Sequence, residues 1–388
     1  MKLKPSCLKG MENMYGLSKL TKYIDEKDIL SLEDTSGRVK IDKTNSKINI
    51  NEFVSGIPIA FKGKLNDKGV FVADDYLFYQ PGNLTNQLNN DTPMDIESNV
   101  SSPNKNLILF ISNLRIGNLN EDEDGKLPTA RTMLVDFIQN NNLNNKLSEI
   151  SNRIKRVIFL GSSVYVNEKI EELEKGSFIK AEEYKKELNL IIKNYTLLDK
   201  FLKLIASYIH VDLINGIEGN DGVYFPQNNN SQFLFLDNMV NINAKTLNLV
   251  SNPFEFEIYS QKIKSKKSFL GTSGENIKCI LQYTDINDPL EAMQKTIEWG
   301  HLAPLAPDTL RTYPYSQNEP LLLNKIPDIY FISGNKVLNK KVIDYNKKEI
   351  LLMELPDFSQ TCIGVIYNID DNTINEIKFD QKLKFQKN

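Results

Sequence analysis

The sequence predicts a mixed α/β protein in which a small β-rich unit precedes a layered α/β domain. Short apolar or alternating stretches separated by polar turns fill residues 26–85, as in small all-β units. A continuous apolar run at 107–111 and similar stretches at 157–160 and 211–214, the last with one Asp, suit strands covered on both faces. A long amphipathic pattern before the third run predicts a helix, and alternating strands and helices are typical of a layered core.

At 388 residues the chain exceeds the usual size of one hydrophobic core, so two domains are expected. The β-rich stretches lie at 29–32, 39–41, 48–50, 57–61 and 70–72, and they predict a small barrel or sandwich. Between Leu84 and Asn106 the composition turns polar, with Pro and Ser, as in an exposed loop. We therefore expect a first domain at 1–89, a flexible linker at 90–104, a second domain at 105–380 and a tail at 381–388.

The second domain begins with the three apolar runs and gains further sheet toward its end. Its predicted helix carries apolar side chains at intervals of three or four, and strand-like stretches follow at 254–258, 328–333, 349–355 and 361–369. The apolar positions of the helix are Tyr184, Leu188, Ile191, Tyr195, Leu198, Phe201 and Ile205.

Composition argues against several classes of protein. With 47 Lys and Arg against 50 Asp and Glu, the chain lacks the basic excess that autonomous tight DNA binding requires. Cys7, Cys279 and Cys362 lie too far apart for a zinc knuckle or a disulfide framework, which favours a reducing compartment. We find no leader-like apolar segment and no run near the ~20 residues of a membrane helix, so a soluble intracellular protein is expected.

Candidate catalytic groups are scarce, because the chain has only two histidines. A dinuclear metallohydrolase usually needs several imidazoles plus carboxylates to hold two cations. His301 could act as a ligand or base, but a local hydrogen bond within its Pro-rich loop is the favoured interpretation. His210 closes the predicted helix and is expected to interact with the helix dipole or with solvent. No GxSxG elbow or cysteine–histidine pair is present.

Two further segments have a functional and a structural interpretation. The loop Gly271–Asn276 could cradle a phosphate, but it lacks the lysine and spacing of a P-loop, and a tight turn between a strand and a helix is favoured. Lys262, Lys264, Lys266 and Lys267 could meet phosphate, yet they are expected at the solvated tip of a hairpin. The residues alone therefore indicate a two-domain protein without a visible active site or cofactor site.

Several segments together carry a resemblance to a known family. They are LSLED at 30–34, RVKI at 38–41, FLGTSG at 269–274, GHLAPLAPDTL at 300–310, YPY at 313–315 and LPDFS at 355–359. Their order and spacing, from about residue 3 to 380, resemble the small (B, regulatory) subunits of eukaryotic DNA polymerase delta. The motif positions are Gly271, Thr272, Ser273, Gly274, His301, Pro304, Pro307 and Asp308.

This resemblance implies the fold and the state of the site. It implies that residues 1–89 form an OB-type β-barrel that begins inside the barrel, leaving an unpaired sheet edge, and that 105–380 form an inactive calcineurin-like phosphoesterase domain. Active members hold two cations with Asp-x-His, Gly-Asp, Gly-Asn-His, His-Gly and Gly-His-x-His elements. Other residues stand at those positions here, so no catalytic, metal or cofactor residue is expected; they are Asn113, Arg115, Ser162, Glu218, Gly271, Asn335 and Val337.

The function implied is that of a non-catalytic accessory subunit in the nucleus, acting in DNA replication and repair. It would scaffold the cysteine-rich C-terminal domain of the catalytic polymerase chain and a third accessory subunit, with DNA reached only through the complex and no membrane involved. The corresponding subunits of polymerase alpha or epsilon share the domain pair and remain an alternative. From other classes, an active metal-dependent phosphodiesterase or nuclease and an OB-type nucleic-acid binder also remain.

Overall fold

The computed structural model describes most of the chain. The described ranges are 2–3, 30–34, 37–42, 53–81, 105–117, 125–141, 143–166, 181–216, 224–229, 234–235, 246–260, 262–313, 319–334, 336–380 and 383–387. The predicted strand at 48–50, the predicted linker at 90–104, and two of the site positions, Glu218 and Asn335, lie outside these residues. None of the helices in these ranges combines the length and the apolar character needed to cross a membrane.

The first unit consists of short antiparallel strands, as predicted. In the described part, β1 (Lys2–Leu3), β2 (Ser31–Asp34) and β3 (Gly37–Lys40) form one sheet, and β4 (Ile59–Leu65) and β5 (Phe71–Phe78) form a hairpin. The Asp42 N–H donates to the Phe71 carbonyl at 2.9 Å, which joins the sheet to the hairpin. In this sheet β1 pairs with β2 in antiparallel register and forms one of the two edges.

The second unit contains two sheets. Among the described residues the first sheet has the order β17-β16-β15-β6-β7-β8-β9, in which β6 to β9 run parallel. These strands are β6 (Leu107–Ser112), β7 (Ile154–Gly161), β8 (His210–Asn215), β9 (Leu247–Val250), β15 (Ile363–Asn368), β16 (Ile374–Lys378) and β17 (Lys384–Lys387). Every residue of β6 is buried, which explains its uninterrupted apolar sequence.

The second sheet has the order β10-β11-β12-β14-β13 within the described chain, with β11, β12 and β14 parallel. Its strands are β10 (Phe254–Ser260), β11 (Ser265–Thr272), β12 (Ile329–Ser333), β13 (Asn339–Tyr345) and β14 (Lys348–Leu355). The two sheets stack face to face, and aromatic and aliphatic side chains fill the layer between them. Phe110 of β6 and Phe331 of β12, for example, have ring centroids 4.8 Å apart.

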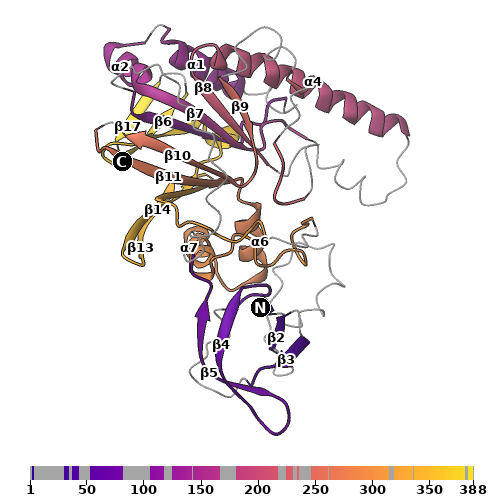
Figure 1. The fold of residues 1–388 in the computed structure, drawn as a ribbon. Coiled ribbons are helices and arrows are strands. Elements are labelled where there is room, and N and C mark those ends of the chain that lie inside the picture. Colours follow the sequence, from indigo (N-terminus) through magenta and orange to yellow (C-terminus); the bar gives the residue numbers. More distant parts are fainter. Residues whose placement is uncertain are drawn as a thin grey trace.

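Helices cover the outer face of each sheet (Figure 1). Over the first sheet lie α1 (Lys126–Gln139), α2 (Asn145–Arg153) and α4 (Ala181–Ala206), whereas α6 (Glu275–Tyr283) and α7 (Pro289–Trp299) lie between the second sheet and the strands of the first unit. A single turn, α8 (Phe358–Thr361), follows β14. The predicted fold class, mixed α/β with a β-rich unit before a layered domain, is confirmed.

Local sequence explains where several helices begin. The Asn144 side chain accepts the Leu147 N–H at the start of α2, and Asp288 accepts the Leu290 N–H at the start of α7. Pro289 occupies the first position of α7, where a missing N–H costs nothing. The predicted helix over 184–205 is confirmed as α4.

Three expectations need correction. The segment 381–388, expected to be a tail, contains β17, which pairs with β16 and extends the first sheet. His210 does not close the helix, because α4 ends at Ala206 and His210 opens β8. Of the hairpin lysines, Lys262 and Lys264 are exposed as expected, whereas Lys267 donates to the Tyr367 hydroxyl at 3.2 Å.

The two units share one apolar core. Leu30, Ile57 and Ile59 of the first unit pack in the same cluster as Trp299 and Leu302 of the second. Two glycines allow the backbones to touch: a Cβ on Gly56 would lie 1.9 Å from the Pro304 carbonyl oxygen, and one on Gly300 would lie 2.8 Å from the Tyr79 carbonyl oxygen. These close approaches fix the first unit against the end of α7.

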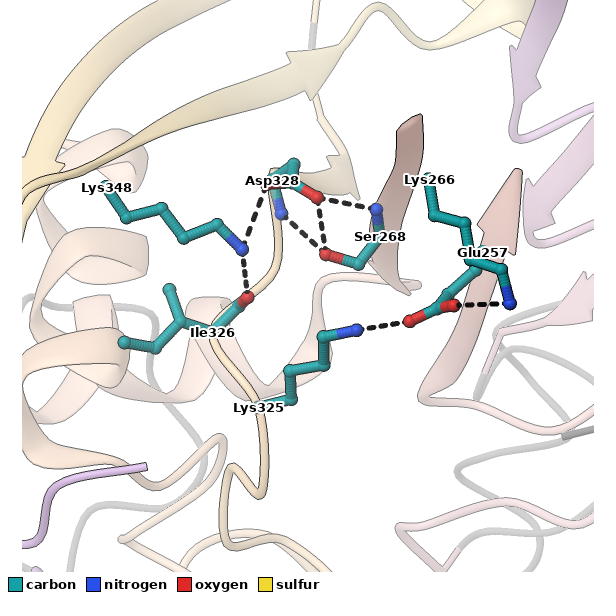
Figure 2. A network of polar contacts seen from close by, with 7 residues as sticks. All are labelled: Glu257, Lys266, Ser268, Lys325, Ile326, Asp328 and Lys348. Carbon is teal, nitrogen blue, oxygen red and sulfur yellow. Dashed lines mark hydrogen bonds and ion pairs between the residues drawn. The ribbon is translucent and has the colours of Figure 1, made fainter. Parts of the chain in front are cut away.

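A charged network lies where β11, β12 and β14 begin, at the end of the second sheet opposite their carboxyl ends. Figure 2 shows its residues. Asp328, just before β12, accepts the N–H and hydroxyl of Ser268, each at 2.7 Å, and pairs with Lys348 at 2.9 Å. Lys325 and Lys266 both pair with Glu257 of β10. Burial works to raise the pKa of Asp328, but the hydrogen bonds from Ser268 and Lys348 outweigh it and the pKa is lowered.

The close contact at Gly56 gives a stability prediction. Gly56→Ala should destabilise the protein by about 2 kcal/mol or more, because it adds a clash with Pro304 to a left-handed backbone (φ 84°). Gly69→Ala is the matched control, since Gly69 is also left-handed (φ 72°) but its Cβ would meet open space, and it should cost only about 1 kcal/mol. Urea unfolding of both variants measures the difference, and equal losses would contradict the contact.

The Asp328 network gives a pH-dependent prediction. Asp328→Ala should lower the free energy of unfolding by about 1–3 kcal/mol at pH 7, because two hydrogen bonds and an ion pair are lost. A carboxyl whose folded pKa is lowered stabilises the fold above its unfolded pKa of about 3.9. The difference from wild type should therefore shrink as the pH falls through and below that value. Glu349→Ala, at an exposed position of β14, should change stability by less than about 0.5 kcal/mol.

Candidate functional site at the carboxyl ends of the strands

The carboxyl ends of strands from both sheets meet in one place. A Cβ on Gly161, at the end of β7, would lie 2.3 Å from Asn113 Oδ1 and 3.2 Å from Ser333 Oγ. One on Gly216, after β8, would lie 2.8 Å from the Gly161 carbonyl carbon. Ligand sites of layered α/β folds form at such carboxyl ends, so this cluster is the candidate functional site.

Asn113 is the central side chain of the site. It follows β6 in a left-handed conformation (φ 52°), which asparagine tolerates better than most residues. Its buried Oδ1 accepts the Ser162 N–H at 3.0 Å, and its Nδ2 donates to Asp357 Oδ2 at 3.3 Å. One amide thus joins the ends of β6 and β7 to the segment that follows β14.

Asp357 supplies a buried carboxylate to the site. It begins α8, where Oδ1 accepts the Ser359 N–H at 2.9 Å and the Ser359 hydroxyl at 2.6 Å. Burial raises the pKa of Asp357, and the hydrogen bonds from Ser359 and the positive charge of Arg115 limit the rise. Arg115 thus lies near enough for its positive charge to lower the pKa of Asp357.

The loop that carries Asn113 and Arg115 is held from both sides. The Arg131 guanidinium of α1 donates to the carbonyl oxygens of Leu114 and Arg115, at 2.6 and 2.7 Å. The Arg115 N–H donates to the Ser162 carbonyl at 3.0 Å, which continues the pairing of β6 with β7 beyond the sheet. The amide of Asn113 is thus positioned by a fixed backbone.

The half of the site that belongs to the second sheet is built from amides and hydroxyls. The Ser333 hydroxyl, at the end of β12, donates to the Ser273 carbonyl at 2.8 Å. The Asn252 side chain accepts the Ser273 N–H at 3.2 Å and donates to Gln227 Oε1 at 2.8 Å and to the Ser273 hydroxyl. Gln227 in turn donates to the Gly216 carbonyl at 3.3 Å. This series of hydrogen bonds therefore connects the end of β12 to the residue that follows β8.

The loop after β11 is a strand-to-helix turn, as favoured from the sequence. Gly271 packs flat on the Phe331 ring, where a Cβ would lie 2.3 Å from the ring carbon Cζ. Thr272 donates its hydroxyl proton to Asn276 Oδ1 at 3.0 Å, and the Asn276 amide donates to the Leu302 carbonyl at 2.9 Å. Gly274 begins α6 with φ 95°, and its Cβ would lie 2.8 Å from the Ser333 carbonyl.

The motif at 300–310 lies at the contact between the two units. His301 is buried, its Nδ1 accepts the Ala303 N–H at 3.1 Å, and its Nε2 lies 3.7 Å from Glu319 Oε1. This is the local hydrogen bond favoured from the sequence. Pro304 faces Gly56 of the first unit, whereas Pro307 and Asp308 are exposed.

The structure brings together only some of the predicted site positions. Asn113 and Ser162 are in direct contact, and the positive charge of Arg115 lowers the pKa of their neighbour Asp357. Gly271 lies in β11 and packs against the Phe331 ring. Val337 lies before β13 and is 64% exposed. In the described residues no group of three or more His, Cys, Asp and Glu side chains is arranged to hold a metal ion. The side chains of Asn113, Ser162, Ser333 and Asn252 are neutral amides and hydroxyls. They do not supply the carboxylate and imidazole ligands that the two cations of a phosphoesterase site require.

Sequence reasoning missed several members of the site, namely Asp357, Ser333, Asn252 and Gln227. Asp357 stands in the LPDFS block, and its position directly after an apolar strand was a signal that could have placed it at a carboxyl strand end. Its Asp-x-Ser pattern also matches a capping turn. Asn252 and Gln227 lie in irregular segments that carry no such signal.

The amide at position 113 gives a prediction with a defined pH dependence. Asn113→Asp should lower the free energy of unfolding by about 2 kcal/mol at pH 7, because a second buried carboxylate replaces the amide that donates to Asp357. Burial and Asp357 raise the folded pKa of the introduced carboxyl. The deficit should therefore be greatest above that raised pKa and shrink as the pH falls toward the unfolded value of about 3.9.

The matched control for this prediction is Asn66→Asp. Asn66 lies in an exposed turn, where its Oδ1 accepts the Lys68 and Val70 N–H groups, so a carboxylate keeps both hydrogen bonds. Urea unfolding across a pH series compares the two variants. A loss at position 113 that is equally large at every pH would contradict the electrostatic account.

Comparisons with known proteins agree with the sequence resemblance. A family model that describes the B subunits of DNA polymerases alpha and epsilon matches residues 108–337, and one that describes the OB-fold domain of the DNA polymerase delta subunit matches residues 1–76. The first unit is therefore the OB-fold domain expected from the sequence.

Curated relatives match along nearly the whole chain. The DNA polymerase delta small subunit of Oryza sativa subsp. japonica is 27% identical over 98% of this chain and 81% of its own length. The protein of the same name from Saccharomyces cerevisiae is 28% identical over 98% and 77%, and DNA polymerase delta subunit 2 of Drosophila melanogaster is 25% identical over 92% and 75%. The resemblance to delta small subunits is confirmed.

Solved structures match with low scores. An archaeal phosphodiesterase is 10% identical over 70% of this chain and 98% of its own, with a TM-score of 0.28. A mutant of Vps29 from Entamoeba histolytica is 10% identical over 73% of this chain and 98% of its own, with a TM-score of 0.29. The matches of the two family models, with the full-length relatives, show that the chain belongs to the B-subunit family of DNA polymerases alpha and epsilon.

Proposed function

We propose that the chain is a non-catalytic accessory subunit of DNA polymerase delta that acts as a scaffold in the nucleus, in DNA replication and repair. The observation that carries the proposal is the network at the carboxyl strand ends, where Asn113 accepts from Ser162 and donates to Asp357. These groups bind one another in the place where a phosphoesterase would bind two cations. Support for the polymerase assignment comes from relatives named as delta small subunits.

The proposed partners are the cysteine-rich C-terminal domain of the catalytic polymerase chain and a third accessory subunit. The shared core of the two units supports a scaffold role, because Gly56, Gly300 and the 300–310 motif hold the OB-fold domain rigidly against the second domain. A rigid pair of domains presents a continuous surface without the cost of ordering a hinge. DNA is reached through the complex, in line with a net charge of −3.

Co-expression tests the scaffold proposal. The chain should purify as a stoichiometric complex with the C-terminal domain of the delta catalytic subunit, measured by affinity capture and light scattering. The corresponding domains of the alpha and epsilon catalytic chains are the matched controls. Capture of either of these in preference to the delta domain would transfer the assignment to that polymerase, and capture of none would contradict the scaffold role.

A nuclease assay tests the non-catalytic part of the proposal. The purified chain should cleave neither single-stranded DNA nor a model phosphodiester with Mn²⁺ or Mg²⁺, because the strand-end donors are engaged with each other. Asn113→Ala and Asp357→Ala serve as matched variants that disturb the site. Metal-dependent cleavage by wild type that either substitution abolishes would revive the phosphodiesterase or nuclease alternative.

A further inference from the structure

Helix α4 carries an unusual row of exposed apolar side chains. It lies on the outer face of the first sheet and projects past the edge of that sheet (Figure 1). One side of α4 is buried in the core through Ile191, Leu198 and Leu202. Beside this buried side, Leu197 and Leu204 are 41% and 50% exposed, and Tyr208, in the turn that follows α4, is 59% exposed.

These residues follow a heptad spacing. Within α4, Leu190, Leu197, Phe201 and Leu204 succeed one another at intervals of seven, four and three residues, and Tyr208 follows four residues later in the turn after the helix. Leu190 and Phe201 are half-buried, and Phe201 also packs against Phe159 of the core. Such a spacing places side chains in a single straight row, as in the seam of a coiled coil. We call these five residues the α4 seam. Exposed apolar side chains that gather in a row of this kind mark interaction surfaces more often than scattered ones do.

A row of positive charge runs along the seam. Lys186, Lys193 and Lys200 repeat every seven residues, so they lie on one side of the helix next to the seam, and all three are exposed. Within the described residues none of the three has an ion-pair partner. In coiled coils the charges that flank the apolar row select a partner of opposite charge. The row therefore calls for acidic side chains on the partner.

We propose that the α4 seam and its lysine row form a docking surface for an acidic amphipathic helix of a partner protein. Pairing with a second copy of this chain is disfavoured, because it would bring the lysine row of one α4 against that of the other. A membrane surface is disfavoured because most of the apolar side of α4 is already buried against the sheet. The inference uses only the surface of α4 and does not depend on the polymerase assignment.

Peptide binding to the full chain tests the proposal. The probe is a fluorescent synthetic helix of about four heptads, with leucine in its apolar row and glutamate beside it, and the comparison peptide has lysine in place of glutamate. Fluorescence anisotropy should show binding of the glutamate peptide and not of the lysine peptide. The affinity should weaken with added salt, because the flanking charges are exposed.

Seam variants separate the docking surface from general effects. The double variant Leu197→Asp, Leu204→Asp should weaken binding at least about tenfold, which corresponds to about 1.4 kcal/mol. Ile192→Asp is the matched control, because Ile192 is 57% exposed on the same helix but away from the seam. The affinity of this variant for the glutamate peptide should equal that of wild type. Circular dichroism checks that each variant keeps its helix content.

Charge reversal provides a second, independent test. The double variant Lys193→Glu, Lys200→Glu leaves the core untouched. It should weaken binding of the glutamate peptide and strengthen binding of the lysine peptide. Failure of both peptides to bind, or equal losses in the Ile192 and seam variants, would overturn the proposal. Self-association that the seam variant abolishes would assign the seam to a second copy, and binding to anionic vesicles without peptide binding would assign it to a membrane; either result would also overturn the proposal.

Discussion

The architecture depends on the close contact between the two domains. Gly56 meets the Pro304 carbonyl and Gly300 meets Tyr79, at distances that leave no room for a side chain. Gly300 ends α7, which packs on the second sheet, and that sheet stacks on the first through residues such as Phe331. The glycine contacts therefore set the position of the OB-fold domain relative to the strand ends. The conspicuous HLAP sequence at 301–304, which contains a histidine, belongs to this contact.

At the strand ends, hydrogen bonds join the polar groups of the site to one another. A cation site needs several negative or imidazole donors turned toward one point, whereas Asn113 offers one acceptor and one donor that are both used by neighbours. Asp357 keeps a carboxylate there, but Ser359 and the charge of Arg115 balance it from within the chain. The second domain thus keeps the layered scaffold and the convergence of strand ends while its polar groups satisfy one another.

Much of the fold could be predicted because burial leaves a direct mark on sequence. The runs within β6 and β7 are apolar since both faces are covered, and α4 shows its period clearly. The run within β8 differs only at the buried Asp212, which pairs with Arg156 of β7. Edge strands leave no such mark: β13 is mostly exposed and rich in lysine, and β17 was mistaken for a tail. The pairing of Asn113 with Asp357 spans 244 positions. Only the three-dimensional stacking of strand ends reveals that contact, so motif reading found Asn113 and missed Asp357.

The Asn113 amide also limits which residues can stand at this position. Because Nδ2 lies 3.3 Å from Asp357 Oδ2, a carboxylate here would set two buried acids side by side. Such a change lowers stability whatever the protein binds elsewhere. Selection on folding alone is therefore enough to keep an uncharged hydrogen-bond donor at position 113 for as long as Asp357 stays buried beside it.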